Sequence, residues 1–259
     1  MLFEITNWLT GSVIFSIDLT TEQWPDRWRI AVYAAIKAEI SLNNAELNGA
    51  ELNGAELNYA KLNGAELNDA KLNGAELNDA ELNFAKLNGA ELNYAELNYA
   101  KLNNAKLNNA KLNGAELNNA KLNGAELNGA ELNDAKLNGA KLNGAELTHI
   151  RDDLWAVLSA APHEVQGLRA ALIAGRVNGS VYKGECACLI GTIANLQHRA
   201  YTDLPNLRPN SSRPIERFFL AIEEGDTPET SQVVKIIVEW IDDWRARMQK
   251  AFGSKEQTA

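Results

Sequence analysis

Leucine recurs at every fifth position from Leu42 to Leu147 without interruption. Alanine stands two positions before almost every one of these leucines, and Asn follows almost all of them. A fixed internal period constrains the fold more than any other feature, so it is interpreted first. On an α-helix a step of five residues advances about 140° net, which would scatter the leucines around the helix. The repeat therefore does not predict a helix.

An extended chain fits the repeat better, because alternation points Ala and Leu inward and points Glu or Lys and the Asn outward. Five is an odd number, so the chain must turn a corner in every unit. Four corners of about 90° close a square coil of twenty residues. The corner residue is mostly Gly, Asn or Asp, which tolerate a positive φ. Turns that avoid positive φ are expected at the bulkier corners Tyr59, Phe84, Tyr94, Tyr99 and His149.

The stretch AELNGAELNG resembles the pentapeptide-repeat family, whose A-[DN]-L-x-x units build a right-handed quadrilateral β-helix. Here Glu or Lys precedes the Leu where the family favours Asp or Asn, but that position faces solvent and leaves the fold expectation unchanged. The resemblance implies a mainly β solenoid over residues 41–149. Its interior, filled by Leu and Ala, is expected to have no room for a ligand.

Residues 1–40 are expected to cap the first coil, because an open β-helix end exposes its core and unpaired strand edges. The segments FEITNW and VIFSIDL alternate apolar and polar residues and predict a hairpin around Thr10 and Gly11. A helix is predicted after Pro25, with one side running into the first repeat. That side consists of Trp28, Val32, Ala35, Ile36 and Glu39. This hairpin-helix cap is similar to that of pentapeptide-repeat proteins met in phage and prophage genomes.

Residues 150–259 lose the period and are expected to form a separate, mainly α-helical C-terminal domain. The apolar spacing predicts helices over 151–160, 163–174, 187–197, 213–224 and 229–252. The last of them carries a stripe made of Val233, Ile237, Trp240, Trp244 and Met248. Such a stripe is usually core, although it could instead form a homodimer interface through the C-terminal helix.

The cysteines Cys186 and Cys188, with His198, resemble a sparse metal or nucleophile set, to which His163 could add a fourth ligand. Their spacing matches no motif with a defined mechanism. Cysteine is often a small buried residue, and apolar residues follow this pair. We therefore expect no catalytic residue, no metal and no cofactor.

Net charge and hydropathy narrow the classes of partner. A formal net charge of -9 disfavours a phosphate-binding surface, so direct binding of nucleic acid is not expected. No apolar run reaches the length of a membrane span, and the N-terminus does not resemble a secretory signal. The sequence predicts a cytoplasmic protein that does not enter a membrane.

Residues twenty apart should stack on neighbouring coils, so each outward column can be read from the sequence. One column alternates in sign, and another is mostly basic. A third is acidic for four coils before Lys136 ends it. Combined with aromatic corners, it gives a candidate interaction surface. This surface comprises Glu56, Glu76, Glu96, Glu116, Phe84, Tyr94 and Tyr99.

These observations predict a non-enzymatic structural or protein-interaction protein, a rigid rod that displays charged faces and positions a C-terminal helical domain. Its partner would be another protein. One alternative follows from the resemblance, because some family members mimic a DNA duplex and bind a type II topoisomerase such as gyrase. Lysines at nine outward positions argue against a mimic, which needs charge of one sign. A second alternative is an enzyme of unknown type in the C-terminal domain.

Overall fold

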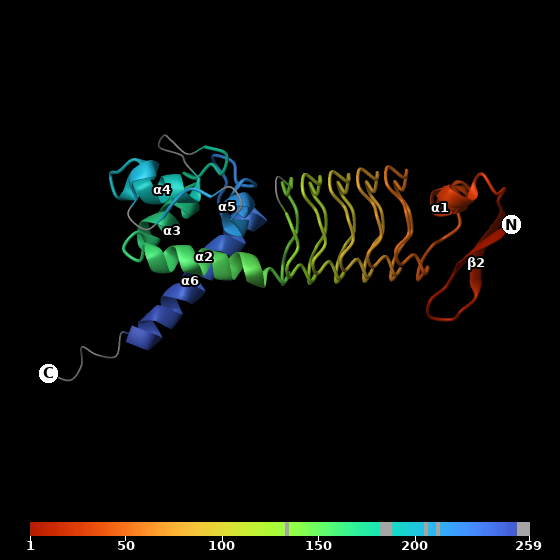
Figure 1. Cartoon of the computed structure of the whole chain (residues 1–259). Coiled ribbons are helices and arrows are strands. Elements are labelled where there is room, and N and C mark those ends of the chain that lie inside the picture. The colour runs from red at the N-terminus through yellow and green to blue at the C-terminus, as the bar shows by residue number, and fades with distance from the viewer. Residues whose placement is uncertain (133–134, 182–187, 205–206, 211–212, 253–259) are drawn as a thin grey trace. The chain divides into compact units, whose positions relative to one another are not determined.

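A computed structural model describes residues 1–132, 135–181, 188–204, 207–210 and 213–252. The chain divides into two compact units, Met1–Leu147 and Thr148–Ala259, which are described separately. The first unit holds an N-terminal hairpin, a helix and the repeat (Figure 1).

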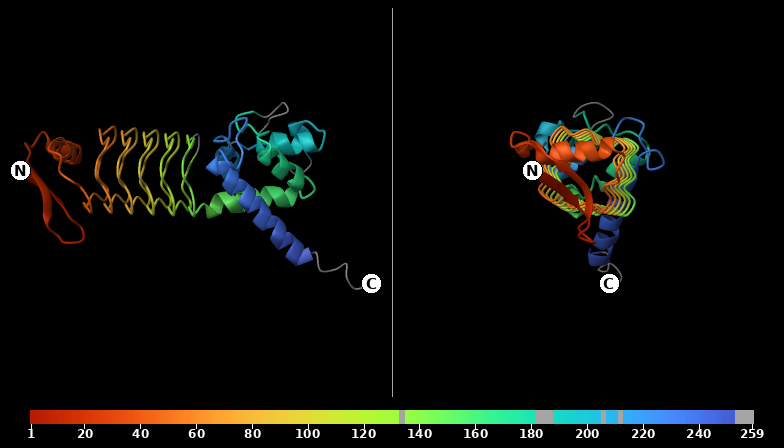
Figure 2. Two further views of the ribbon diagram at one scale, coloured as in Figure 1. Left: turned by 180° about the vertical axis from the view of Figure 1, so that it is seen from behind. Right: turned by 90° about the vertical axis from the view of Figure 1, so that its right-hand side faces the viewer.

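The repeat is a four-sided coil. From Glu46 to Glu126, each outward Glu or Lys pairs in parallel with the outward residue twenty positions later, as between Glu51 and Lys71. Viewed along its axis, the coils superpose into one square outline (Figure 2). The predicted stacking of residues twenty apart is thereby confirmed.

The hydrogen bonds between coils have a direction. Leu57 donates its N–H to the carbonyl of Glu76 at 2.7 Å, and Glu76 donates its N–H to the carbonyl of Ala55 at 2.9 Å. The same pattern recurs from coil to coil. Each outward residue therefore points both its N–H and its C=O toward the preceding coil.

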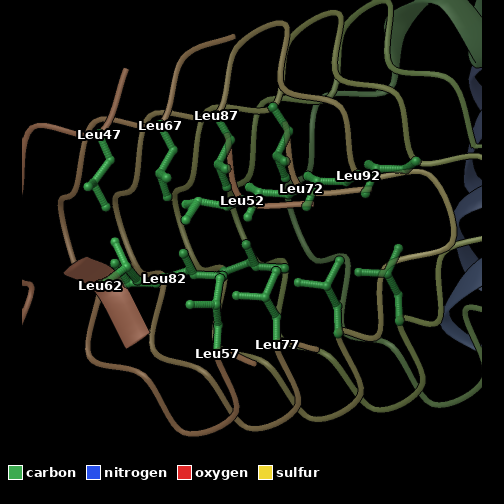
Figure 3. A pocket seen from close by; sticks show the side chains of 16 residues that line it. Leu47, Leu52, Leu57, Leu62, Leu67, Leu72, Leu77, Leu82, Leu87 and Leu92 are labelled. Atoms are coloured by element: carbon green, nitrogen blue, oxygen red, sulfur yellow. The ribbon is translucent and has the colours of Figure 1, made fainter. Parts of the chain in front are cut away.

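The leucines fill the interior in four rows, one from each side of the coil (Figure 3). Every repeat leucine from Leu42 to Leu147 is at most 7% exposed. The space left between them is about 10 Å³, which is no more than one water molecule needs, and its walls are apolar. The expectation that the interior cannot hold a ligand is confirmed. Each buried leucine contributes roughly 1.5–3 kcal/mol to the stability of the coil.

The prediction that aromatic corners avoid positive φ is wrong at four positions. The φ angles are 62° at Tyr59, 60° at Phe84, 58° at Tyr94 and 62° at Tyr99, the same left-handed turn as at the Gly and Asn corners. Closure of the coil imposes this turn, since the corner N–H is also used between coils; that of Tyr94 donates to the carbonyl of Asn113 at 2.9 Å. His149 lies in a helix instead.

The Asn after each Leu does more than face solvent. Its side chain bonds to the equivalent Asn of the next coil, as where Asn68 donates both its backbone N–H and its Nδ2 to Oδ1 of Asn48 at 3.0 Å. Most of these side chains are half-buried. The Asn positions thus form hydrogen-bonded ladders along the coil, a role that alternation alone did not predict.

Side chains at the corners lean over the corner of the next coil. A Cβ added at Gly114 would lie 2.6 Å from Cδ1 of Tyr94, and one added at Gly64 would lie 2.4 Å from Oδ1 of Asn44. At Gly74, in the same corner column as Gly114, nothing lies within 4 Å. A large corner residue therefore restricts the residue twenty positions later.

The N-terminal segment forms the predicted hairpin and helix. Strands β1 (Leu2–Thr6) and β2 (Val13–Asp18) pair antiparallel, with a register irregularity between Ile5 and Thr6. A 3-10 turn, η1 (Trp24–Asp26), leads into α1 (Arg27–Lys37). Two details differ from the expected pattern. Val13 is half exposed at the strand end, and Glu39 lies beyond the helix with a φ of 58°.

Helix α1 and the end of the hairpin attach to the first coils. Val32 of α1 is buried and lines the same interior as the leucines, so this helix covers the open core. Trp8 donates its backbone N–H to Asn44 at 3.0 Å and its indole N–H to the carbonyl of Gly64 at 2.8 Å. Lys86 places its ammonium 3.9 Å from the centre of the Trp8 ring, in a cation–π contact.

The second unit is helical. Its elements are α2 (Thr148–Ala160), α3 (Val165–Ile173), α4 (Leu189–Leu196), η2 (Tyr201–Asp203), α5 (Pro214–Phe219) and α6 (Gln232–Phe252). Each of the five predicted helices is present with altered ends. Helix α3 ends before Gly175, whose φ of 64° suits a helix terminus. None of the described helices is long and apolar enough to cross a membrane.

Helix α6 packs against α2 and α3 through the predicted stripe. Val233, Ile237 and Trp244 are buried, whereas Trp240 and Met248 stay partly exposed. Arg169 of α3 forms a two-pronged ion pair with Asp242 of α6, at 2.6 Å and 2.8 Å. At least the first part of the stripe is therefore core.

Candidate functional site

The acidic column runs along one side of the repeat. Glu56, Glu76, Glu96 and Glu116 pair successively in parallel, and Lys136 follows in the last described step. We call this side, with the two corner columns that border it, the acidic face. The corners before the glutamates are Gly54, Gly74, Tyr94 and Gly114, and those after them are Tyr59, Asp79, Tyr99 and Asn119.

Three tyrosines therefore lie in the corner columns of the acidic face. Tyr94 and Tyr99 flank Glu96 along the chain, and Tyr59 stands two coils before Tyr99 in the same corner column. Their exposed fractions are 73% for Tyr59, 74% for Tyr94 and 56% for Tyr99. Exposed rings thus lie on both borders of the row of carboxylates.

Phe84 does not belong to this group. It lies at the corner between the columns of Glu81 and Lys86, so the acidic column is not beside it. The predicted surface is therefore brought together in part, with Phe84 on another corner. Tyr59 and Asp79 were not included in the predicted surface, although counting in steps of twenty from Tyr99 reaches both.

Asn side chains orient the glutamates of the acidic face. Asn58 donates to Oε2 of Glu76 at 2.8 Å, and Asn78 donates to Oε2 of Glu96 at 2.8 Å. Among the described residues, neither Glu76 nor Glu96 has an ion pair. Each of these carboxylates is thus held in place with one oxygen left for another donor.

Glu116, the last glutamate of the column, differs from Glu76 and Glu96 because it has an ion pair. Lys136 donates to its Oε1 at 2.5 Å, and Asn98 donates to its Oε2 at 3.1 Å. These bonds, the Lys136 bond first, lower the pKa of Glu116. The uncompensated part of the acidic column is therefore Glu56 to Glu96.

Lys–Glu pairs cross the other three outward columns, although the column of Lys61, Glu81, Lys101, Lys121 and Lys141 keeps an excess of lysine. Lysines pair with glutamates of an adjacent coil at distances of 2.6 to 3.5 Å. These pairs are Lys71–Glu51, Lys111–Glu91, Lys86–Glu66, Lys106–Glu126 and Lys101–Glu81. At exposed positions each contributes little to stability, but together they cancel charge on those sides.

The described members of the cysteine and histidine set do not form a metal-binding group. Cys186 lies outside the described residues, Cys188 is 3% exposed, and His198 and His163 are exposed. Burial raises the pKa of the Cys188 thiol, which disfavours the reactive thiolate. In the described segments, no three His, Cys, Asp or Glu side chains are grouped to hold a metal ion.

Comparison with known proteins identifies the repeat. The family model for pentapeptide repeats matches residues 38–74, 75–114 and 110–148. No curated protein matches the chain.

Solved structures of pentapeptide repeat proteins are similar to parts of this chain. One from the Arabidopsis thaliana thylakoid lumen is 25% identical over 44% of this chain and 73% of its own, with a TM-score of 0.37. One from Nostoc PCC 7120 is 43% identical over 29% of this chain and 62% of its own, with a TM-score of 0.29. HetL of Nostoc sp. PCC 7120, described as involved in heterocyst differentiation regulation, is 35% identical over 40% and 60%, with a TM-score of 0.17.

The family match and the coil geometry agree on the same residues. The units stack four to a coil, their leucines and alanines fill the interior, and the Asn ladders join successive coils. Residues 38–148 of this chain are therefore an array of pentapeptide repeats.

Proposed function

We propose that this is a non-enzymatic protein-interaction protein whose acidic face binds a basic segment of a partner protein. The observation that carries the proposal is the row Glu56, Glu76 and Glu96 with exposed tyrosines on both of its borders. The repeat core is closed and uniform, which leaves the outward and corner positions to determine what the rod binds.

The tyrosines have a conformational cost that favours a role in binding. A non-glycine residue in the left-handed region costs roughly 1–2 kcal/mol, and Gly or Asn occupies most other corners of the coil. Tyr59 and Tyr99 are largely exposed, so burial recovers little of that cost. Strained residues that remain exposed tend to gather at functional sites.

The chemistry of the acidic face suits Arg and Lys side chains. A free carboxylate oxygen accepts a charge-assisted hydrogen bond, and a tyrosine ring attracts a cation held over its face. Each exposed contact is worth only about 0.5–1 kcal/mol, so affinity depends on several of them acting together. A partner segment with several basic residues fits this surface best.

The mimicry of DNA has weaker support. A duplex carries one negative charge about every 1.7 Å on all sides, whereas three sides of this coil are crossed by Lys–Glu pairs. The column of Lys101, Lys121 and Lys141 is even basic. These lysines would be repelled by the basic surface with which a partner protein binds DNA.

A binding assay tests the proposal. A fluorescein-labelled peptide of alternating Arg and Gly would be titrated with the full chain at low ionic strength. The double variant Glu76→Gln/Glu96→Gln should weaken binding about 5- to 30-fold, through loss of two charged contacts. The control Glu51→Gln/Glu91→Gln changes net charge equally on the neighbouring column and should have a smaller effect.

A second variant separates the rings from the charge. Tyr59→Asn/Tyr99→Asn keeps the left-handed turns, as Asn104 does with a φ of 56°, and leaves net charge unchanged. This variant should weaken binding of the same peptide by a similar factor. If both glutamate pairs act equally and the tyrosine variant has no effect, binding is non-specific attraction and the proposal fails.

A further inference from the structure

Two sides of the first coil have their outer edges covered by the chain itself. On one side, Glu46 donates its N–H to the carbonyl of Thr6 at 2.8 Å, and Trp8 donates to Asn44 at 3.0 Å. On another side, Leu42 donates to the carbonyl of Lys61 at 2.9 Å. Segments of the chain therefore act as added strands at these two edges.

The other two edges, at Glu51 and Glu56, are uncovered. Every outward residue directs its N–H and C=O toward the preceding coil, and no coil precedes these two. Within the part of the chain that the structure describes, neither residue has a backbone hydrogen-bond partner on that side. Each edge thus offers one backbone donor and one backbone acceptor on the side that faces away from the next coil.

A groove of about 310 Å³ lies at the Glu56 edge. One wall is the segment from Gly54 to Leu57, and the other consists of Arg29, Ile30 and Tyr33 of α1. Its size falls at the lower end of the range for ligand pockets. Glu51 does not line it, so this second wall accompanies the Glu56 edge and not the Glu51 edge.

We propose that this groove binds an extended peptide segment of a partner protein by strand addition to the Glu56 edge. The N–H and C=O of Glu56 pair with the peptide backbone, as the hairpin end does at Glu46. Basic peptide side chains face the Glu56 carboxylate, and apolar ones contact Ile30 and Tyr33. Pairing of two copies through these edges is disfavoured, since it would bring Glu51 and Glu56 of each copy together.

Amide hydrogen exchange on the full chain tests the proposal directly. The probe is the capped pentapeptide Val-Lys-Val-Lys-Val, at ten times its measured Kd. Exchange of the Glu56 N–H should slow about tenfold, while that of the Glu51 N–H stays unchanged. The same peptide N-methylated at its central residues cannot pair with the edge and should bind about 3- to 10-fold more weakly.

Two proline variants locate the site. Glu56→Pro removes the free N–H at a strand edge, where proline is tolerated, and should weaken binding of the pentapeptide about 3- to 10-fold. Glu51→Pro makes the same change at the edge outside this groove and should leave peptide binding unchanged. If the Glu56 variant fails to fold, the N-methylated peptide on the native chain decides the question alone.

Three results would overturn the proposal. The first is equal slowing at Glu51 and Glu56, and the second is equal binding of the N-methylated peptide. The third is protection of Glu56 without peptide, rising with protein concentration, which would assign the edge to self-association. The proposal shares only Glu56 with the acidic face, so the slowing of the Glu56 N–H at ten times the Kd of the peptide should persist in Glu76→Gln/Glu96→Gln.

Discussion

The corner column that contains Gly74 and Gly114 allows a sharp test of how neighbouring coils restrict each other. Both glycines have nearly the same φ, 64° and 66°, but only Gly114 lies under the Tyr94 ring. We compare Gly74→Ala with Gly114→Ala. Any difference between them reports the ring, because backbone strain is common to both.

The expected magnitudes follow from the geometry. An alanine in the left-handed region costs roughly 1–2 kcal/mol, and the stiffer unfolded chain offsets about 0.4–1 kcal/mol of it. Gly74→Ala should therefore lower the free energy of unfolding by about 1 kcal/mol. At Gly114 the new Cβ would lie 2.6 Å from the Tyr94 ring, which must rotate away. That movement adds about 0.5–1.5 kcal/mol, the cost of an off-rotamer side chain.

Native-state hydrogen exchange gives the assay, because it measures the opening free energy coil by coil. The Tyr94 N–H, which bonds to Asn113, reports the affected corner. Measured against the single variant Tyr94→Gly, the double variant Tyr94→Gly/Gly114→Ala should lose only about as much free energy of unfolding as Gly74→Ala loses against the native chain. Equal costs for Gly74→Ala and Gly114→Ala would refute the idea that a corner side chain restricts the next coil.

Three further predictions concern stability. Glu66→Gln should lower the free energy of unfolding in urea by about 1–2 kcal/mol, because this carboxylate is only 18% exposed and accepts bonds from Lys86 and Asn48. The control Glu51→Gln changes a carboxylate that is 53% exposed and should have no measurable effect. Asp242→Asn should destabilise the second unit at neutral pH. Arg169 lowers the pKa of Asp242 from its ordinary value of 3.8, so this loss should shrink only as pH falls below about 4, measured by thermal unfolding across pH. Leu87→Ala should cost about 3–5 kcal/mol by the same urea assay, and a cost below about 1 kcal/mol would mean that the core collapses around the gap.

The features that depend on local chain geometry could be predicted from sequence. An odd period with inward Leu and Ala permits few shapes, so the square coil and the stacked glutamates followed from counting. The φ of Tyr94 did not follow, because the preference of tyrosine opposes it and only closure of the coil determines it.

Contacts between segments far apart in the chain could not be predicted from the sequence. Trp8 bonds to Gly64, fifty-six positions away, and no local pattern connects the two. The groove between α1 and Gly54 depends on how α1 packs against the first coil. Tyr59 is a different case, since the period that placed Glu56 also placed it beside the acidic column.

The interior of the coil is the same on all four sides, and this has a consequence for how such a chain can change. Insertion of one five-residue unit would keep every Leu and Ala buried. All outward residues after it, however, would move to the next side of the square. A single short duplication could thus split the row from Glu56 to Glu96 between two sides while Leu and Ala still fill the interior. Only duplications of four units would lengthen the rod and preserve its surface pattern.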